Sequence, residues 1–192
     1  AEKYSAAAFA TKHEDAIYFS KRVTRAVPDG GPIEAHTDLV KKLDYECELA
    51  VVLGRDARDV PAGQTRDYIF GYTILNDVSA RDVQTAHKQW YFGKSLDGFT
   101  PIGPCIVTAD AFADYPPRLG IRSFVNGEKR QDSNTALQIF DIDHVIAELS
   151  QGMTMKAGTI IATGTPAGVG MGMDPPQFLK LSLIHISEPT RR

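Results

Sequence analysis

The stretch from residue 45 to residue 53, YECELAVVL, constrains the fold more than any other segment. It changes from alternating polar and apolar residues to a continuous apolar run, a pattern that predicts a strand half buried at its start and fully buried at its end. Because side chains two apart on a strand point to the same side, Glu46 and Glu48 face the same way, roughly 6 to 7 Å apart along the strand. The chain therefore needs a sheet that places two carboxylates at one end of a buried strand.

Two neighbouring carboxylates on a strand have more than one interpretation. An isolated Glu-x-Glu pair most often marks the solvent side of an amphipathic strand. Here the same side continues as Ala50 and Val52 in a stretch buried on both sides, so the carboxylates lie at the mouth of a core. Close carboxylates that leave water must raise a pKa, find cations or bind a metal ion. We interpret Glu46 and Glu48 as ligands of a divalent cation.

A third carboxylate, Asp77, follows a second strand that we predict over residues 72–75. Side chains commonly converge on a site where a strand ends, although a lone Asp there is more often a turn or capping residue. Three carboxylates suit the hard cations Mg²⁺, Mn²⁺ and Ca²⁺ and leave coordination positions for water and a chelating substrate. The sequence lacks the His and Cys clusters that favour zinc. It predicts a site at Glu46, Glu48 and Asp77 for Mg²⁺, with Mn²⁺ and Ca²⁺ as alternatives.

Three further polar residues are candidates for the same site. Lys94 lies in YFGKSLDGFTPIGP, where glycines and prolines fix the backbone around one charged side chain. It is either a solvated loop lysine or a cation aimed at an enolate or carboxylate beside the metal. Arg81 and Gln84 lie three apart on a helix that we predict over residues 80–90. They face the same way and either bind a substrate carboxylate or keto group or are ordinary surface residues.

The glycine-rich loop at residues 164–172, GTPAGVGMG, is not a phosphate-binding loop. It lacks the Gly-Lys-Ser/Thr ending, and the prolines that follow leave no helix whose N-terminus would hold a phosphate. Two interpretations remain. The loop is a plain tight turn, or it presents the Thr165 hydroxyl and backbone N–H groups to a small carboxylate.

The rest of the chain reads as one domain without repeats or linkers. Residues 1–42 predict an irregular surface arm with a short strand at residues 17–19. Asn126 and Gly127 predict a type I′ hairpin turn. We predict four more features: a short helix within residues 61–70, a helix N-terminus at Ser79 and Asp82, a helix over residues 142–149 capped by Asp141, and a buried strand over residues 159–163.

Composition limits the partners. The formal charge is −3 over 192 residues, which is too balanced for a nucleic-acid surface or a basic membrane face. No apolar run approaches the ~18 residues of a membrane span. Two distant cysteines form neither a disulfide framework nor a CxxC pair and favour a reducing, cytoplasmic location. The expected partner is a small molecule.

Five segments in this order carry a recognisable pattern: YECELAVVLGRDARDV, GYTILNDVSARDVQ, FGKSLDGFTPIGP, VNGEKRQDSNT and GTIIATGTPAGVG. The pattern resembles the fumarylacetoacetate hydrolase family over residues 17–172. The resemblance implies a β-rich α+β fold, a mixed β-sandwich roll, in a homodimer. It implies that Glu46, Glu48 and Asp77 bind a divalent ion, that Lys94 is catalytic, and that Arg81, Gln84 and Thr165 contact the substrate.

Both ends depart from the family pattern. In related hydrolases a His and a Glu on an N-terminal lid activate water, and this chain begins just after that histidine would occur. At the other end, residues 181–192, LSLIHISEPTRR, resemble a translated sequencing adaptor. We therefore expect a single catalytic domain at residues 1–180, a roll incomplete at both ends, and a tail at residues 181–192 that is foreign to the family.

Together these observations predict an enzyme. It would act on a small 2-oxo or β-diketo acid, whose keto and carboxylate oxygens chelate the ion while Lys94 stabilises an enolate. The reaction would be C–C hydrolysis, as in an acylpyruvate hydrolase, or decarboxylation, or an isomerisation. Hydrolysis needs a base that activates water, so the missing lid pair weighs against it. Two alternatives are a 2-oxo-4-enoate hydratase and an inactive metal-binding fragment.

Overall fold

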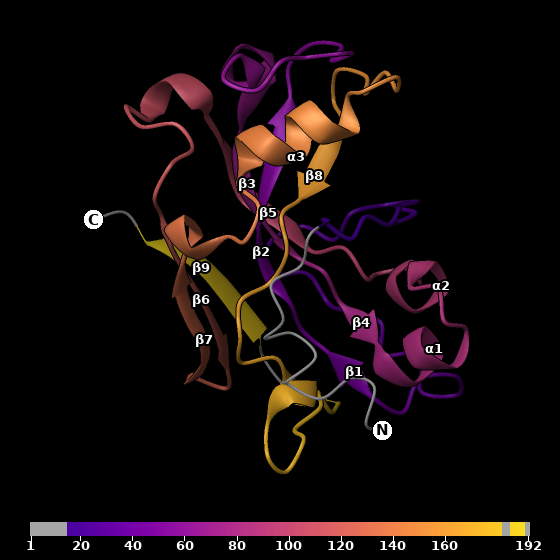
Figure 1. Ribbon diagram of the computed structural model, residues 1–192. Coiled ribbons are helices and arrows are strands. Elements are labelled where there is room, and N and C mark those ends of the chain that lie inside the picture. The colour runs from indigo at the N-terminus through magenta and orange to yellow at the C-terminus, as the bar shows by residue number, and fades with distance from the viewer. Residues whose placement is uncertain (1–14, 182–184, 191–192) are drawn as a thin grey trace.

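The computed structural model of the protein describes residues 15–181 and the backbone of residues 185–190 (Figure 1). Its strands are β1 (Leu43–Asp44), β2 (Cys47–Leu53), β3 (Ile69–Asn76), β4 (Ser79–Ala80), β5 (Ile102–Thr108), β6 (Gly120–Val125), β7 (Glu128–Asn134), β8 (Ile160–Ala162) and β9 (His185–Thr190). Its helices are α1 (Arg81–Ala86), α2 (Tyr91–Lys94) and α3 (Ile142–Leu149). Short 3₁₀ helices lie at Thr65–Tyr68, Ala109–Ala111, Thr135–Leu137 and Gly170–Gly172. The predicted strand-rich α+β class is confirmed.

The central sheet has the strand order β5-β3-β2-β8, and all its neighbours are antiparallel. The predicted strand at residues 45–53 is present as β2, and the register pairs Glu48 with Leu75 of β3. All seven residues of β2 are buried, so the prediction of a half-buried start is wrong. The carboxylate end of the strand is covered because basic side chains from α1 and α2 pack onto it.

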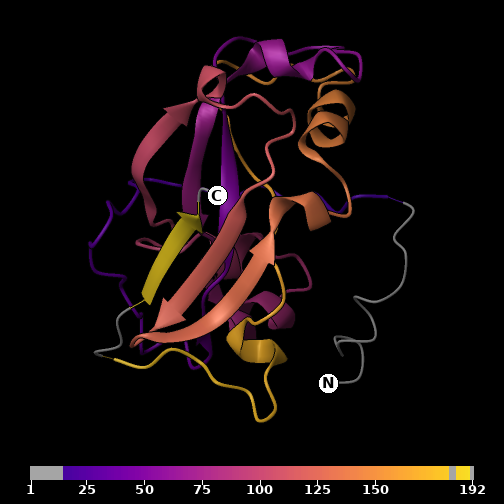
Figure 2. The same cartoon turned by 90° about the vertical axis from the view of Figure 1, so that its left-hand side faces the viewer.

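A second sheet has the order β7-β6-β9 and lies in front of the central sheet in Figure 2. Asn126 and Gly127 have φ angles of 51° and 78°, so the β6–β7 hairpin has the predicted turn with two positive φ angles. Strand β9 pairs with β6 along residues 185–190, inside the segment that the sequence assigns to a foreign tail. Residues 182–184 and 191–192 of that segment lie outside the described residues.

The main core lies on the side of β2 that bears Cys47, Leu49 and Val51. These side chains pack with residues of β3 and β6 and with Ile142 and Ile146 of α3. The helix begins as predicted, because the Asp141 carboxylate accepts a hydrogen bond from the His144 backbone N–H at 2.8 Å. This core fixes β2 and leaves for the site the opposite side, which bears Glu48 and, immediately before the strand, Glu46.

A smaller core holds the elements at the carboxylate end of β2. Residues of β1, β4 and α1 form it together with Val40, Val78 and Phe99. Strand β1 pairs with β4, which places Asp44 opposite Ser79. This pairing brings the segment before β2 against the segment after β3, so residues that are far apart in sequence meet there.

Three local predictions differ from the structure. Residues 17–19 form no strand, and their side chains are exposed. The helix within residues 61–70 is a 3₁₀ helix at Thr65–Tyr68, because β3 already begins at Ile69. The strand at residues 159–163 is present as β8, but Ile160 is 47% exposed because β8 is an edge strand. Residues 1–14 of the predicted surface arm lie outside the described residues.

The helix after Asp77 also differs in detail. It is α1, and it ends at Ala86 rather than near Trp90. Its N-cap is Ala80, without a side-chain cap, because the Ser79 hydroxyl donates instead to the Asp77 carbonyl at 2.8 Å. None of the helices in residues 15–181 has the length and apolar composition that a membrane span requires.

Candidate metal centre

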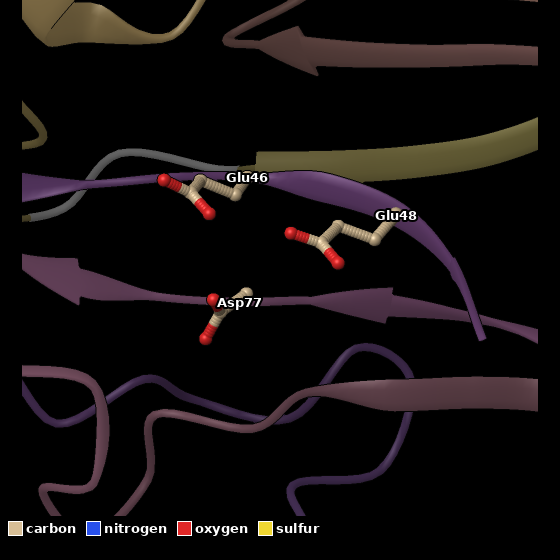
Figure 3. Close-up of side chains that lie close together, drawn as sticks. All are labelled: Glu46, Glu48 and Asp77. Atoms are coloured by element: carbon tan, nitrogen blue, oxygen red, sulfur yellow. The ribbon is translucent and has the colours of Figure 1, made fainter. Parts of the chain in front are cut away.

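The three predicted carboxylates meet at one point of the fold (Figure 3). Glu46 immediately precedes β2, Glu48 lies within it, and Asp77 immediately follows β3. Their approach is fixed by the backbone, because the Asp77 N–H donates to the Glu46 carbonyl at 2.8 Å. One oxygen from each carboxylate lies within 4.8 Å of the others, and all three residues are buried. The geometry therefore brings together the three residues that the sequence predicted as ligands.

Lys94 lies among these carboxylates. Its Nζ is 2.6 Å from Glu46 Oε2 and 2.6 Å from Asp77 Oδ2. The lysine ends helix α2 and is 2% exposed, so the alternative of a solvated loop lysine is wrong. A buried ammonium between two carboxylates is held in place by charge-assisted hydrogen bonds.

The position of Lys94 depends on the close packing of α1 against α2. A Cβ on Gly93 would lie 2.6 Å from the Gln84 backbone nitrogen, so a larger residue at position 93 would force the helices apart. The sequence places a glycine at this contact and the lysine directly after it. The two helices thereby act as one support for Lys94, Arg81 and Gln84.

Arg81 binds two carboxylates at once. Its Nη1 lies 2.6 Å from Glu46 Oε1, and its Nε lies 2.9 Å from Asp44 Oδ2. Arg81 Nη1 also donates to Gln84 Oε1 at 3.2 Å, and both side chains are buried on the same side of α1. The alternative that they are surface residues is wrong. Arg81 Nη2 is buried and has no hydrogen-bond partner among the described atoms.

Asp44 is a member of the site that the sequence did not single out. It is fully buried, and besides Arg81 it accepts hydrogen bonds from the backbone N–H groups of Gly170 at 2.7 Å and Met171 at 2.9 Å. Asp44 thus ties the end of the glycine-rich loop to the guanidinium that faces Glu46. The sequence signal was slight, since one Asp before a strand is common.

The start of the glycine-rich loop is attached to β2. The Gly164 N–H donates to Glu48 Oε2 at 2.8 Å, and the Thr165 hydroxyl donates to the Cys47 carbonyl at 3.2 Å. Thr165 Oγ1 also accepts a hydrogen bond from Gln131 Nε2 at 2.8 Å. These contacts place Thr165 beside the strand that carries the carboxylates. Its contact with a substrate stays a prediction.

Lys21 is a second residue that the sequence did not single out. It comes from the segment predicted as a surface arm, yet its side chain is only 12% exposed. Its Nζ lies 2.6 Å from Asp77 Oδ1, the carboxylate oxygen that Lys94 does not bind. Asp77 is therefore held between two ammonium groups.

The protonation equilibria of the two glutamates differ. Burial disfavours the Glu46 carboxylate, but the adjacent Lys94 and Arg81 cations outweigh burial and lower the pKa of Glu46. Burial, together with repulsion from Asp77 and Glu46, raises the pKa of Glu48 well above its usual value. Glu46 and Asp77 have ammonium or guanidinium partners, whereas the hydrogen-bond donor to Glu48 is the backbone N–H of Gly164. The ionised form of Glu48 is disfavoured in this environment, and a bound cation would stabilise it.

We call the following side chains the acidic cluster: Asp44, Glu46, Glu48, Asp77, Lys21, Arg81 and Lys94. With every member ionised, the four carboxylates exceed the three cations by one charge. The donors are hard oxygens, and among the described residues Glu48 has no ion-pair partner. These residues therefore fit a divalent cation held by Glu46, Glu48 and Asp77.

The fold and the cluster define a strand-rich α+β protein with a buried acidic centre. The chain belongs to the fumarylacetoacetate hydrolase family, because the family model described as "Fumarylacetoacetate (FAA) hydrolase C-terminal" matches residues 2–182. The family expected from the five sequence segments is thereby confirmed. Members of this family among the relatives are enzymes, with names that include a hydrolase, a tautomerase and isomerases.

Three relatives illustrate the likeness. Oxaloacetate tautomerase YisK of Bacillus subtilis (strain 168) is 44% identical over 167 residues, which are 87% of this chain and 55% of that protein. The structure of a fumarylacetoacetate hydrolase (EaFAH) from psychrophilic Exiguobacterium antarcticum has a TM-score of 0.79 at 49% identity, covering 82% of this chain and 56% of that chain. The structure of fumarylpyruvate hydrolase from Pseudomonas aeruginosa in complex with Mn²⁺ and pyruvate has a TM-score of 0.74 at 27% identity. The match covers 86% of this chain and 69% of that chain. The chain spans about half the length of the curated relatives it matches.

Proposed function

We propose that the acidic cluster is the active site of a divalent-cation-dependent enzyme that acts on a small 2-oxo acid through its enolate. The observation that carries the proposal is the position of Lys94, whose buried ammonium lies 2.6 Å from carboxylates of two of the three candidate metal ligands. A fixed positive charge beside a metal site is suited to a reaction in which negative charge develops on an oxygen.

Glu46, Glu48 and Asp77 would hold the cation, with Mg²⁺ as the first choice and Mn²⁺ and Ca²⁺ as alternatives. When bound, such a cation supplies Lewis-acid polarisation of a carbonyl oxygen. The Mn²⁺ and pyruvate named for the Pseudomonas aeruginosa fumarylpyruvate hydrolase structure support a small 2-oxo acid as the ligand.

Four side chains would bind the substrate and its enolate, each at a different group. Arg81 Nη2, which is buried without a described partner, would bind the substrate carboxylate, with the Gln84 amide beside it. Lys94 would stabilise the enolate oxygen, where the low dielectric of a buried site strengthens the interaction. The Thr165 hydroxyl would complete the contacts with the substrate from the glycine-rich loop.

Two reactions need this enolate and no activated water. In keto–enol exchange, the C3–H bond breaks, its electron pair passes into the enolate and the proton leaves to solvent; a proton from solvent then bonds to the enolate oxygen and gives the enol. In decarboxylation, the electron pair of the C–C bond passes into the enolate, carbon dioxide leaves, and the enolate takes up a proton. The likeness to an oxaloacetate tautomerase supports oxaloacetate as the first substrate to test.

Hydrolysis of an acylpyruvate is the second candidate reaction, and the likeness to fumarylpyruvate hydrolase supports it. It passes through the same enolate, but a base must also activate water. Hydration of a 2-oxo-4-enoic acid is a third candidate reaction. We also propose a homodimer, which the family resemblance implies, and a cytoplasmic location, which the cysteine content favours.

The test compares wild type with Lys94→Met and Lys94→Arg, with Mg²⁺ present or removed by a chelator. Oxaloacetate is followed by its enol absorbance and by pyruvate release, and acylpyruvates and a 2-oxo-4-enoic acid are followed by product analysis. We expect metal-dependent turnover that falls by about 100-fold or more in Lys94→Met. The exposed variant Asp132→Asn is the control and should keep full activity.

Each outcome discriminates between the candidates. Turnover that does not depend on Lys94 or on the metal would contradict the proposal. Metal binding without turnover of any of these acids would support the alternative of an inactive metal-binding fragment. The identity of the substrate that turns over assigns the reaction.

A further inference from the structure

The segment at residues 18–22 is attached to α3 and to both ends of α2. The Tyr18 hydroxyl donates a hydrogen bond to the Glu148 carboxylate in α3. The Phe19 ring packs edge-on against the Trp90 ring, with 5.2 Å between centroids. The Arg22 backbone N–H donates to Ser95 Oγ at 3.0 Å. Between these attachments the Lys21 side chain enters the cluster. The attachments fix where Lys21 can reach.

Lys21 contacts the cluster at Asp77. Its Nζ lies 2.6 Å from Asp77 Oδ1 and 3.5 Å from the Val78 carbonyl oxygen. Lys94 Nζ binds the other oxygen, Oδ2, at 2.6 Å. The two oxygens of one candidate metal ligand therefore have different ammonium partners, and the partner on Oδ1 comes from a separate part of the chain.

The charge of Lys21 changes the balance of the whole cluster. The ionised cluster carries a formal charge of −1, and a bound divalent cation makes it +1. A 2-oxo acid with one carboxylate then brings the ternary complex to zero. If the Lys21 charge is removed, the formal charge is −2 for the free cluster, 0 for the metal-bound cluster and −1 for the ternary complex.

From this arithmetic we propose that Lys21 is a positioning residue that sets the charge of the site: it weakens the binding of the divalent cation and strengthens the binding of the anionic substrate to the metal-loaded protein. The inference rests on the proposed function, since it assumes that the cluster takes both ligands. Lys21 acts through Asp77 and the field of its ammonium group, without being a metal ligand itself.

The two effects have opposite signs, and this distinguishes the proposal from a structural role. Loss of a purely structural contact would disorder Asp77 and weaken the binding of both Mn²⁺ and pyruvate. Loss of a nearby cation in a buried site should instead tighten Mn²⁺ binding and weaken pyruvate binding, each on the order of tenfold.

The experiment measures the two affinities separately by electron paramagnetic resonance. Free Mn²⁺ is titrated against the protein, and pyruvate is then titrated into the Mn²⁺-saturated protein. Lys21→Met keeps the aliphatic stem without the charge, Lys21→Gln keeps a hydrogen-bond donor without the charge, and Lys21→Arg keeps the charge. Arg22→Met, which removes an exposed charge from the same segment, is the matched control.

We expect Lys21→Met and Lys21→Gln to bind Mn²⁺ more tightly and pyruvate more weakly than wild type, with Lys21→Arg and Arg22→Met close to wild type. If either neutral variant loses affinity for both ligands, or keeps both affinities unchanged, the charge role of Lys21 is wrong. If Lys21→Met does not fold, Lys21→Gln decides the question. A wild-type protein that binds no Mn²⁺ at the cluster contradicts the proposed function itself.

Discussion

Asp44 and Arg81 form a buried ion pair 37 residues apart in sequence, with Arg81 Nε 2.9 Å from Asp44 Oδ2. The same carboxylate accepts backbone hydrogen bonds from Gly170 and Met171. One side chain therefore fixes both the guanidinium that faces Glu46 and the end of the glycine-rich loop. The pair links the segment before β2 to the helix after β3.

Replacing Asp44 by Asn should destabilise the protein strongly. The amide has one acceptor oxygen where the carboxylate has two, so backbone donors lose partners and Arg81 loses a counter-charge. Removing one member of a buried ion pair typically costs about 3 to 5 kcal/mol. We expect a loss of this size in the free energy of unfolding, measured by urea denaturation.

The control for Asp44→Asn is Asp132→Asn. Asp132 pairs with Arg122 and Lys129 on the surface, where such pairs contribute about 0 to 1 kcal/mol. A similar small change in both variants would show that the Asp44–Arg81 pair does not hold the site together.

Gly93→Ala should also destabilise the protein, although alanine favours a helix over glycine by about 1 kcal/mol. The added Cβ would lie 2.6 Å from the Gln84 backbone nitrogen, and backbone cannot move aside as a flexible side chain can. Overpacking of this kind costs about 1 to 3 kcal/mol. We expect a lower melting temperature together with lower turnover, because Lys94 and Arg81 would shift.

Gly172→Ala provides the comparison for Gly93→Ala. A Cβ at position 172 would lie 3.7 Å from the Val169 side chain, an ordinary contact. This variant should melt within a few degrees of wild type. If Gly93→Ala proves equally harmless, the two helices are not the tight support that we describe.

The free energy of unfolding of the metal-free protein should decrease as pH rises, because of Glu48. Its pKa is raised above the ordinary value of 4.5 by burial and by repulsion from Asp77 and Glu46. Above pH 4.5 the folded protein therefore holds a proton that the unfolded chain has lost, so the contribution of Glu48 to stability declines as pH rises toward the folded pKa. The slope is at most about 1.4 kcal/mol per pH unit.

The measurement is the difference between the unfolding free energies of wild type and Glu48→Gln across this pH range. We expect wild type to lose stability relative to the variant as pH rises, and Mg²⁺ to restore it, since the ion binds the folded, deprotonated site. A difference that does not vary with pH would contradict the assignment of Glu48 as the carboxylate without a cation partner.

The local pattern of the sequence predicts several elements well. The apolar run of β2, the Asn126-Gly127 turn and the Asp141 cap of α3 each depend on neighbouring residues alone. It also predicts Glu46, Glu48 and Asp77 as one site, because each carboxylate lies at or beside the end of a strand. The same reasoning overestimated the burial of β8, since an edge position cannot be recognised within one strand.

The ion-pair partners of the carboxylates were harder to predict. Lys21 lies in an irregular segment without periodicity, and Asp44 is a single acid before a strand. Both enter the site through contacts that span 37 or more positions in sequence. The sequence indicates Lys94 as a candidate, but its burial depends on the packing of α1 against α2, which no spacing in the sequence encodes.

The most direct test of the account is a crystal structure of the protein with Mn²⁺, in which anomalous scattering locates the ion. We predict an ion bound by one oxygen from each of Glu46, Glu48 and Asp77, at distances of about 2.0 to 2.6 Å. An ion bound elsewhere, with Lys94 and Lys21 keeping their places on an ion-free Asp77, would contradict the central claim.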